Sequence, residues 1–292
     1  MPLSALALVL AAALLHALWN IVAKHSGGDQ RFAFIAAVQL SVIWAPLGLW
    51  VGWGVVGLWG WREWLAVLAS AIVHVVYFTT LLRGYRLADL TVVYPIARGT
   101  GPLLSATGAV LLLGERLSLL GMVGVAGVVA GVFLIAGGPA LWSQAHDPAQ
   151  RERVRRGIGY GALTGALIAG YTLIDGYAVT VLMVSPILVD WFGNLLRIPF
   201  LLPGALRDRA GLREAWRTQW KHALVVALFG PIGYVLVLYA MRLAPLSHVA
   251  PAREVSMLFA ALIGGRLLGE RDRGLRVAGA LCIAAGVVSL AA

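Results

Sequence analysis

Long apolar runs separated by short polar stretches divide this chain into ten segments. A helix needs about 20 mostly apolar residues to span a membrane. Splitting the chain at charged residues and at glycine and proline predicts ten such helices. They cover residues 4–25, 33–52, 63–86, 90–113, 119–137, 157–180, 186–206, 222–242, 247–268 and 274–291. The pattern predicts an all-α polytopic membrane protein. The first segment lacks the basic start of a signal peptide, so we expect it to be retained as a helix.

The two halves of the chain resemble each other. LLRGYRLADLTVVYPIAR (81–98) matches VLYAMRLAPLSHVAPAR (237–253), and the triplet GER recurs at 114–116 and 269–271. The longest polar stretch, residues 142–156, falls between the fifth and sixth predicted helices. An internal duplication explains these matches. It predicts one five-helix repeat over residues 1–139, a cytoplasmic linker over 140–156, and a second five-helix repeat over 157–292.

An odd number of helices in each repeat requires the second repeat to be inverted relative to the first. The charges give independent support, because cytoplasmic loops of membrane proteins are rich in Lys and Arg. With both termini in the periplasm, 16 basic residues lie on the cytoplasmic side and only Arg62, Arg116 and Arg242 lie outside. Inverted repeats that surround a midplane site are typical of secondary transporters that work by alternating access.

Composition agrees with a membrane location, because 60% of the residues are hydrophobic and only 12% are charged. A net charge of +10 could indicate a nucleic-acid partner. Here the basic residues lie in short loops between apolar segments, where they act as topology signals. We therefore expect the partners to be the lipid bilayer and a small-molecule substrate, with no nucleic acid.

The two proline-to-GER blocks and the glycine-rich segment LSLLGMVGVAGVVAGVFLIA (117–136) resemble the drug/metabolite transporter superfamily, in its ten-helix EamA-type exporter branch. The opening helix, LLHALWNIVAK (14–24), is similar to the tryptophan-containing first helix of that family. The density of aromatic residues on central helices is most similar to the bacterial aromatic amino acid exporters.

The resemblance implies export of amino acids, aromatic or other bulky neutral ones, across the bacterial inner membrane. It also implies a central cavity lined by the first, third, fourth, sixth, eighth and ninth helices. Small multidrug members of the superfamily carry a carboxylate in the first helix, where this chain has none. Two alternatives are an exporter of another metabolite or drug-like solute with the same fold, and a membrane enzyme acting on lipid intermediates.

Polar residues inside spans face a cavity or a partner, because they are expensive in lipid. On the first helix His16, Trp19 and Asn20 share one face, and on the third helix His74, Tyr77 and Phe78 repeat that spacing. Such faces offer hydrogen bonds beside aromatic surface, as an amino acid substrate requires. The alternative interpretation is that these side chains hold neighbouring helices together.

The fourth and ninth helices each carry a proline close to an arginine. Pro95 and Pro251 remove a backbone donor and predict flexible hinges or gates. Arg98 could bind a substrate carboxylate, neutralise Asp175 or Glu254, or reach the headgroups. Adjacent residues on a helix point about 100° apart, so Arg253 and Glu254 are expected to find separate partners. The remaining substrate-binding candidates in this part of the sequence are Tyr94 and Met257.

On the sixth helix, Tyr171 and Asp175 lie one turn apart. Asp175 is a candidate proton carrier, since a carboxyl in a low-dielectric span can alternate between its charged and neutral forms. A structural pairing with an arginine explains it equally well. Tyr234 on the eighth helix is a further substrate-binding candidate. Asp190, Asn194 and Arg197 on the seventh helix indicate a structural network.

No catalytic, cofactor or metal-binding constellation is found, because the six histidines are scattered and no phosphate loop or GxSxG motif occurs. We therefore predict no enzyme activity, no cofactor and no metal. Gly127 and Gly131, like Gly161 and Gly165, permit close helix crossing. The sequence does not decide whether these pairs join the two halves or two molecules, and we expect a monomer.

Overall fold

A computed structural model describes residues 1–25, 29–88, 90–135, 148–259 and 273–292. All regular elements in these residues are helical. They are α1 (Leu3–His25), α2 (Gln30–Ile43), α3 (Ala45–Gly52), the 3-10 turn η1 (Val56–Leu58), α4 (Trp61–Leu87), α5 (Leu90–Leu112), α6 (Leu119–Ile135), α8 (Pro148–Thr180), α9 (Pro186–Leu206), α10 (Arg209–Leu243), α11 (Leu246–Ala252) and α13 (Arg273–Ala291).

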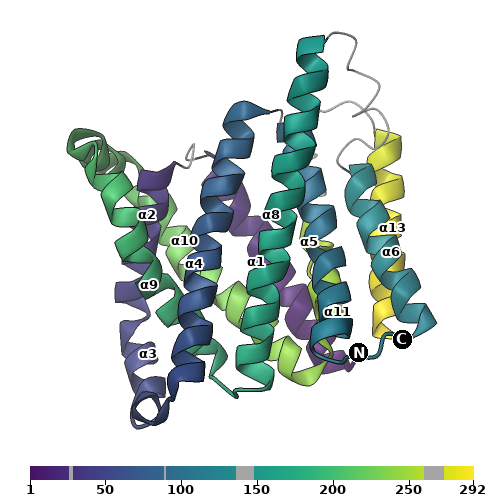
Figure 1. Cartoon of the computed structure of the whole chain (residues 1–292), viewed down its shortest axis with the longest axis horizontal. Coiled ribbons are helices and arrows are strands. Elements are labelled where there is room, and N and C mark those ends of the chain that lie inside the picture. The colour runs from purple at the N-terminus through teal and green to yellow at the C-terminus, as the bar shows by residue number, and fades with distance from the viewer. Residues whose placement is uncertain (26–28, 89, 136–147, 260–272) are drawn as a thin grey trace.

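The helices stand side by side, and the two halves run in opposite directions (Figure 1). α1 starts at the lower end of the view, whereas α8, the first helix of the second half, starts at the upper end. Both chain termini lie at the lower end, where the ammonium group of Met1 donates a hydrogen bond to the carbonyl of Ala291 (2.9 Å). The predicted inversion is therefore confirmed. We call this end the terminal end and the other the opposite end.

The two halves interleave instead of forming separate bundles. α1 packs on α10, and the equivalent helices with the halves exchanged, α4 and α8, pack on each other. α2 packs on α9, and α6 packs on α13, which are each the same position in the two repeats. The contacts therefore follow a two-fold pattern. The main hydrophobic core draws on both halves, from Val9 on α1 to Leu290 on α13.

Four predicted spans differ from the pattern that the sequence predicts. The second is divided into α2 and α3, which are bent by 53° at Trp44. The sixth and eighth start earlier than predicted, because α8 already begins at Pro148 and α10 at Arg209. The polar residues before these spans therefore extend the helices beyond their apolar parts. The ninth is interrupted after α11 ends at Ala252, and helical structure resumes at Val255 after a turn over Arg253 and Glu254.

Three described helices are long and apolar enough to cross a membrane by themselves, namely α4, α8 from Gln150 onward, and α10. The bent pair α2 and α3 makes a fourth span if it is counted as one. Shorter apolar helices cover Leu3–Trp19, Leu119–Ile135 and Val277–Ala291.

Glycines bring helices of the two halves into close contact. A Cβ atom added to Gly131 on α6 would lie 2.7 Å from Cγ1 of Ile283 on α13, and one on Gly279 would lie 2.7 Å from the carbonyl oxygen of Gly131. On α8, a Cβ atom at Gly161 would lie 2.8 Å from Cβ of Ile96 on α5. These glycines therefore serve contacts between the halves of one chain, which is the alternative that the sequence left open.

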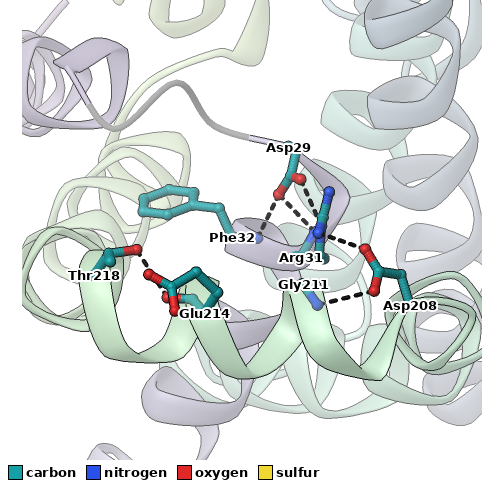
Figure 2. Close-up of polar contacts among 7 residues, drawn as sticks. All are labelled: Asp29, Arg31, Phe32, Asp208, Gly211, Glu214 and Thr218. Carbon is teal, nitrogen blue, oxygen red and sulfur yellow. Dashed lines mark hydrogen bonds and ion pairs between the residues drawn. The ribbon is translucent and has the colours of Figure 1, made fainter.

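At the opposite end, an ion-pair network joins the start of α2 to the start of α10 (Figure 2). Asp29 caps α2 by accepting hydrogen bonds from the N–H groups of Arg31 (2.9 Å) and Phe32 (3.0 Å). The Arg31 guanidinium bridges Asp29 (2.8 Å) and Asp208 (3.0 Å), and Asp208 in turn accepts from the N–H of Gly211 (2.8 Å). Burial acts to raise the pKa of Asp29, but the hydrogen bonds from Phe32 and Arg31 outweigh it and lower this pKa.

The terminal end is held by contacts of another kind. The Glu115 carboxylate, from the first GER triplet, accepts hydrogen bonds from the N–H groups of Leu246 (2.7 Å) and Ser247 (2.8 Å) and so caps α11. Arg242 donates to backbone carbonyls at the end of α8, including that of Val179 (3.0 Å). An open pocket of about 380 Å³ lies between Glu115 and Arg242. Glu115 therefore caps a helix of the other half.

Candidate functional site

The break after α11 places two charged residues inside the molecule. Past Pro251, the N–H of Glu254 donates to the carbonyl of Pro251 (2.9 Å), three residues back. Ser256 and Met257 donate with the same spacing, to Arg253 (3.1 Å) and Glu254 (2.9 Å). Such tight turns within a helical segment often mark functional positions. Discontinuous helices also form the binding sites of many inverted-repeat transporters.

Glu254 forms an ion pair with the arginine of the other repeat. Its carboxylate lies 2.9 Å from Nη2 of Arg98 on α5, and the side chains are 1% and 13% exposed. Nη2 of Arg98 also donates to the hydroxyl of Ser256 (3.1 Å). The pair is incompletely bonded, because Nε of Arg98 and the facing Glu254 oxygen have no hydrogen-bond partner of suitable geometry among the described residues. Of the alternatives open from the sequence, Arg98 therefore neutralises Glu254.

Arg253 is buried beside this pair, with 8% of its surface exposed. In the part of the chain that the structure describes, no carboxylate lies within ion-pair distance of its guanidinium group, although its backbone is bonded within the turn. The positive charge of Arg253 influences three titratable groups, namely Glu254 in the same turn, Asp175 on α8 and His74 on α4. A buried charge is costly unless it is paired or hydrogen-bonded, which makes Arg253 a candidate for contact with a ligand's negative group.

An aromatic cluster lies next to these charges. His74, at the middle of α4, stacks on Tyr171 of α8 with ring centroids 3.9 Å apart. Tyr171 also contacts Tyr77, one turn along α4 (5.7 Å), and the ring of Tyr234 on α10 meets His74 edge-on (6.0 Å). The charges of Arg98 and Arg253 both reach Tyr77. The rings therefore lie within electrostatic range of both arginines.

Asp175 adds a negative group to this site. It is 1% exposed, and its Oδ2 accepts a hydrogen bond from the hydroxyl of Tyr234. Its other oxygen, Oδ1, has no hydrogen-bond partner among the described residues. Ser70 is a near neighbour of Asp175, and its hydroxyl also lies 3.3 Å from Nδ1 of His74. We use the term central cluster for the set of His74, Tyr77, Arg98, Tyr171, Asp175, Tyr234, Arg253 and Glu254.

The close approach of α5, α8 and α4 explains how residues distant in sequence meet here. Gly101 on α5 faces Ile168 on α8, where an added Cβ would lie 3.0 Å from Cγ2 of Ile168. Gly84 on α4 similarly accommodates Cβ of Tyr160 at 3.0 Å. These contacts press α4 and α5 against α8, which places His74 and Arg98 beside Tyr171.

The remaining predicted site residues are placed less centrally. On α1, the rings of His16 and Trp19 contact each other at 4.9 Å, and the charges of Arg98 and Arg253 act on His16. The side chain of Asn20 lies outside the described residues. Phe78 is half-buried and Tyr94 is 39% exposed.

The other predicted residues of the ninth span lie in the protein interior. Met257 is buried in the main core. Pro95 lies within an unbroken α5, whereas Pro251 lies one residue before the end of α11. The two copies of the proline motif therefore differ in backbone structure, although their sequences are alike.

Sequence reasoning missed two serines that hold the charged and aromatic residues. Ser256 bonds Arg98, and Ser70 bonds His74 through both its hydroxyl and its carbonyl. Both could have been noted as polar residues inside spans, and Ser70 stands one helical turn before His74. On α9, Asn194 donates to Asp190 (3.2 Å) and accepts from Arg197 (3.1 Å), which is the network expected there.

Comparison with known proteins identifies the family. The EamA-like transporter family matches residues 3–137 and again residues 155–292. The chain belongs to the EamA-like transporter family. Members of this family are multi-pass membrane transporters of the drug/metabolite type, as the sequence motifs predicted.

Solved structures support the fold of this EamA-like protein. One crystal structure, whose title reads only "Crystal structure of protein", covers 99% of this chain and 96% of its own, with a TM-score of 0.73. The two sequences are 16% identical, so the likeness concerns the fold alone. Among curated proteins, no sequence matches this chain significantly.

Proposed function

We propose that this protein exports amino acids, aromatic or other bulky neutral ones, across the bacterial inner membrane by alternating access. One observation carries the proposal. Among the described residues, Arg98 Nε and Asp175 Oδ1 are buried without a hydrogen-bond partner, and the rings of His74, Tyr77 and Tyr171 contact one another in the same region. Buried groups of this kind need an explanation such as a ligand. An amino acid has one anionic group, one cationic group and an apolar side chain, which together complement the central cluster.

Each part of the substrate has a matching residue. The guanidinium of Arg253 is available for the substrate carboxylate, and a guanidinium suits a carboxylate because it donates two parallel hydrogen bonds. Asp175 Oδ1 is available for the ammonium group. His74, Tyr77 and Tyr171 offer ring faces and edges to an aromatic side chain. Arg98 holds Glu254 in place beside this site.

The interleaving of the halves restricts the motion that alternating access requires. Because α4 packs on α8 and α1 on α10, neither repeat moves without displacing helices of the other. We place the terminal end at the periplasm, as the distribution of basic loops indicates. The Glu115 contact then closes the outer side, and the Arg31–Asp208 contact closes the cytoplasmic side.

Sidedness has a direct test. A fluorescent protein that matures only in the cytoplasm, fused after Ala292, is expected to stay dark, while a phosphatase that is active only in the periplasm is active there. A bright fluorescent fusion with an inactive phosphatase contradicts the proposed orientation.

Transport is tested with purified protein in liposomes and labelled phenylalanine, threonine and a nucleoside. We expect phenylalanine to cross fastest. Arg253→Ala weakens its binding, because loss of a charged hydrogen bond costs about 1.5–3 kcal/mol, which is roughly 10- to 150-fold in affinity. Arg207→Ala, at an exposed position after α9, is the control and leaves transport unchanged. If no amino acid crosses, the proposed substrate class is wrong.

A further inference from the structure

Asp175 differs from the other buried acids of the central region in how its charge is balanced. Glu254 lies 2.9 Å from Arg98. Asp190 accepts from Asn194 on its own helix. Asp175 instead lies between helices of both halves, with the hydroxyl of Tyr234 bonded to one oxygen, Ser70 as a close neighbour, and no cation at ion-pair distance among the described residues. A buried carboxylate without a cation beside it is neutralised by taking up a proton.

The surroundings of Asp175 are partly charged and titratable. The groups that face or influence it are His74 from α4, Tyr171 from α8, Arg197 and Asp190 from α9, Tyr234 from α10, and Arg253 from the turn after α11. Neither Arg197 nor Arg253 lies within ion-pair distance of the Asp175 carboxylate in the described structure.

His74 is held in one tautomer and is therefore less suited to carry the exchanged proton. Its Nδ1 lies 2.9 Å from the carbonyl oxygen of Ser70. A carbonyl accepts only, so Nδ1 carries a hydrogen and donates it. The ring is also packed against Tyr171. The imidazole therefore serves as a fixed wall beside Asp175.

We propose that Asp175 is the proton-exchange site of this transporter, and that a proton and the ammonium group of the substrate occupy its carboxyl group in turn. This inference rests on the proposed function. In the empty transporter the carboxyl is protonated. When an amino acid binds, the O–H bond of Asp175 breaks, the proton leaves to water, and the ionised carboxylate pairs with the ammonium group.

The exchange balances in charge. The substrate enters as a zwitterion with no net charge, its carboxylate pairs with Arg253, and one proton leaves for each molecule bound. On the other side of the membrane the amino acid departs and Asp175 takes up a proton from that side. A proton gradient directed into the cell would then drive export, because protons and substrate move in opposite directions.

The test measures protons released by the purified full-length protein in weakly buffered detergent solution with a pH-sensitive dye. Phenylalanine is the probe, and its binding is measured in parallel by calorimetry. We expect wild-type protein to release about one proton per phenylalanine bound, because the carboxyl must ionise to pair with the ammonium group. Asp175→Asn should release none, whereas Asp190→Asn, at the neighbouring buried acid, should still release about one proton per phenylalanine bound.

The same variants are then compared in liposomes. Wild type and Asp190→Asn should accumulate phenylalanine against its gradient when a pH gradient is imposed, and Asp175→Asn should not. Should Asp175→Asn fail to fold, Tyr234→Phe keeps the carboxyl and removes its hydrogen-bond donor. That variant should move the proton release to higher pH, since the hydroxyl stabilises the ionised carboxylate.

The outcomes separate this inference from the proposed function. Proton release that persists in Asp175→Asn, or a release profile unchanged in Tyr234→Phe, overturns the assignment to Asp175. If wild type binds and transports phenylalanine without releasing protons, the exchange is wrong while the proposed function stands. If no amino acid is bound or transported, the proposed function itself fails.

Discussion

Arg98 and Arg253 stand in matching motifs of the two repeats, yet they face different electrostatic situations. Arg98 has Glu254 at 2.9 Å and Ser256 at 3.1 Å, so its charge is balanced within the protein. Arg253 has no carboxylate at ion-pair distance in the described part of the chain. The difference follows from Glu254, because the first motif has Gly99 in the corresponding place after its arginine. The acid that follows Arg253 is therefore paired with the arginine of the other repeat.

At the residue scale, we predict that Arg98 and Glu254 depend on each other for stability. Arg98→Met leaves a buried carboxylate without its cation and should lower the free energy of unfolding by about 3–5 kcal/mol. The double variant Arg98→Met with Glu254→Gln removes both charges and should recover most of that loss. Thermal unfolding in detergent measures the effect. A double variant no more stable than Arg98→Met would show that the ion pair is unimportant.

At the element scale, the two proline motifs give one continuous helix and one broken helix. α5 continues from Leu90 to Leu112 through Pro95, whereas α11 ends at Ala252 and a tight turn follows. Glu115 caps the start of α11 from the other half, which shows that this short helix is stabilised by tertiary contacts. The broken copy also carries Arg253, whose guanidinium has no carboxylate at ion-pair distance among the described residues.

For the hinge, we predict that Pro251→Ala lowers transport more than it lowers the amount of folded protein. Alanine restores the missing N–H and favours continuation of α11 through Arg253, which would redirect the guanidinium and reduce flux roughly tenfold, equivalent to about 1.4 kcal/mol. Pro95→Ala should alter flux less, because α5 is already continuous. Flux is normalised to folded protein from size-exclusion chromatography. Equal losses of flux and folded protein in Pro251→Ala would argue against a hinge.

For the helix crossings, we predict opposite effects of two glycine-to-alanine substitutions. Gly131→Ala places a Cβ atom 2.5 Å from the carbonyl oxygen of Gly279, so α6 and α13 must separate and stability should fall. Gly159→Ala on α8 meets nothing within 4 Å and should stabilise the helix by about 0.5–1 kcal/mol. Thermal unfolding of both variants checks this. Two variants of equal stability would contradict the close crossing.

At the scale of the whole molecule, the two ends are closed by different interactions. The terminal end relies on Glu115 and Arg242, which bond to backbone groups at helix ends. The opposite end relies on side-chain ion pairs around Arg31, of which Asp208 is 59% exposed. Exposed ion pairs are weak and are screened by salt. The opposite end is therefore the more easily separated of the two.

Acid should loosen the opposite end first. Because folding lowers the pKa of Asp29, its contribution is present above the unfolded pKa of about 3.9 and is lost as the pH falls through the lower folded pKa. Asp29→Asn keeps a side-chain acceptor for the helix cap but has no charge to titrate. Unfolding temperatures between pH 7 and pH 3 should therefore fall less in Asp29→Asn than in wild type. Parallel curves would contradict the role of this charge.

The sequence by itself determined the membrane fold, the duplication and the inversion. These properties depend on the order of apolar segments, on the odd number of helices in a repeat and on the placement of basic loops, all of which are local features of the chain. It also selected most residues of the central cluster, because polar side chains inside apolar spans are few. His74, Tyr171 and Asp175 were each visible in this way.

Only the tertiary structure decided how these residues are paired. Arg98 had three possible partners in the sequence, and the packing of α5 against the turn after α11 selected Glu254. The use of Gly131 and Gly161 for contacts within one chain was likewise decided by which helices lie side by side. The Arg98–Glu254 pair and the Gly131–Gly279 crossing join residues more than a hundred positions apart. The pattern of residues along a single helix carries no record of its neighbour.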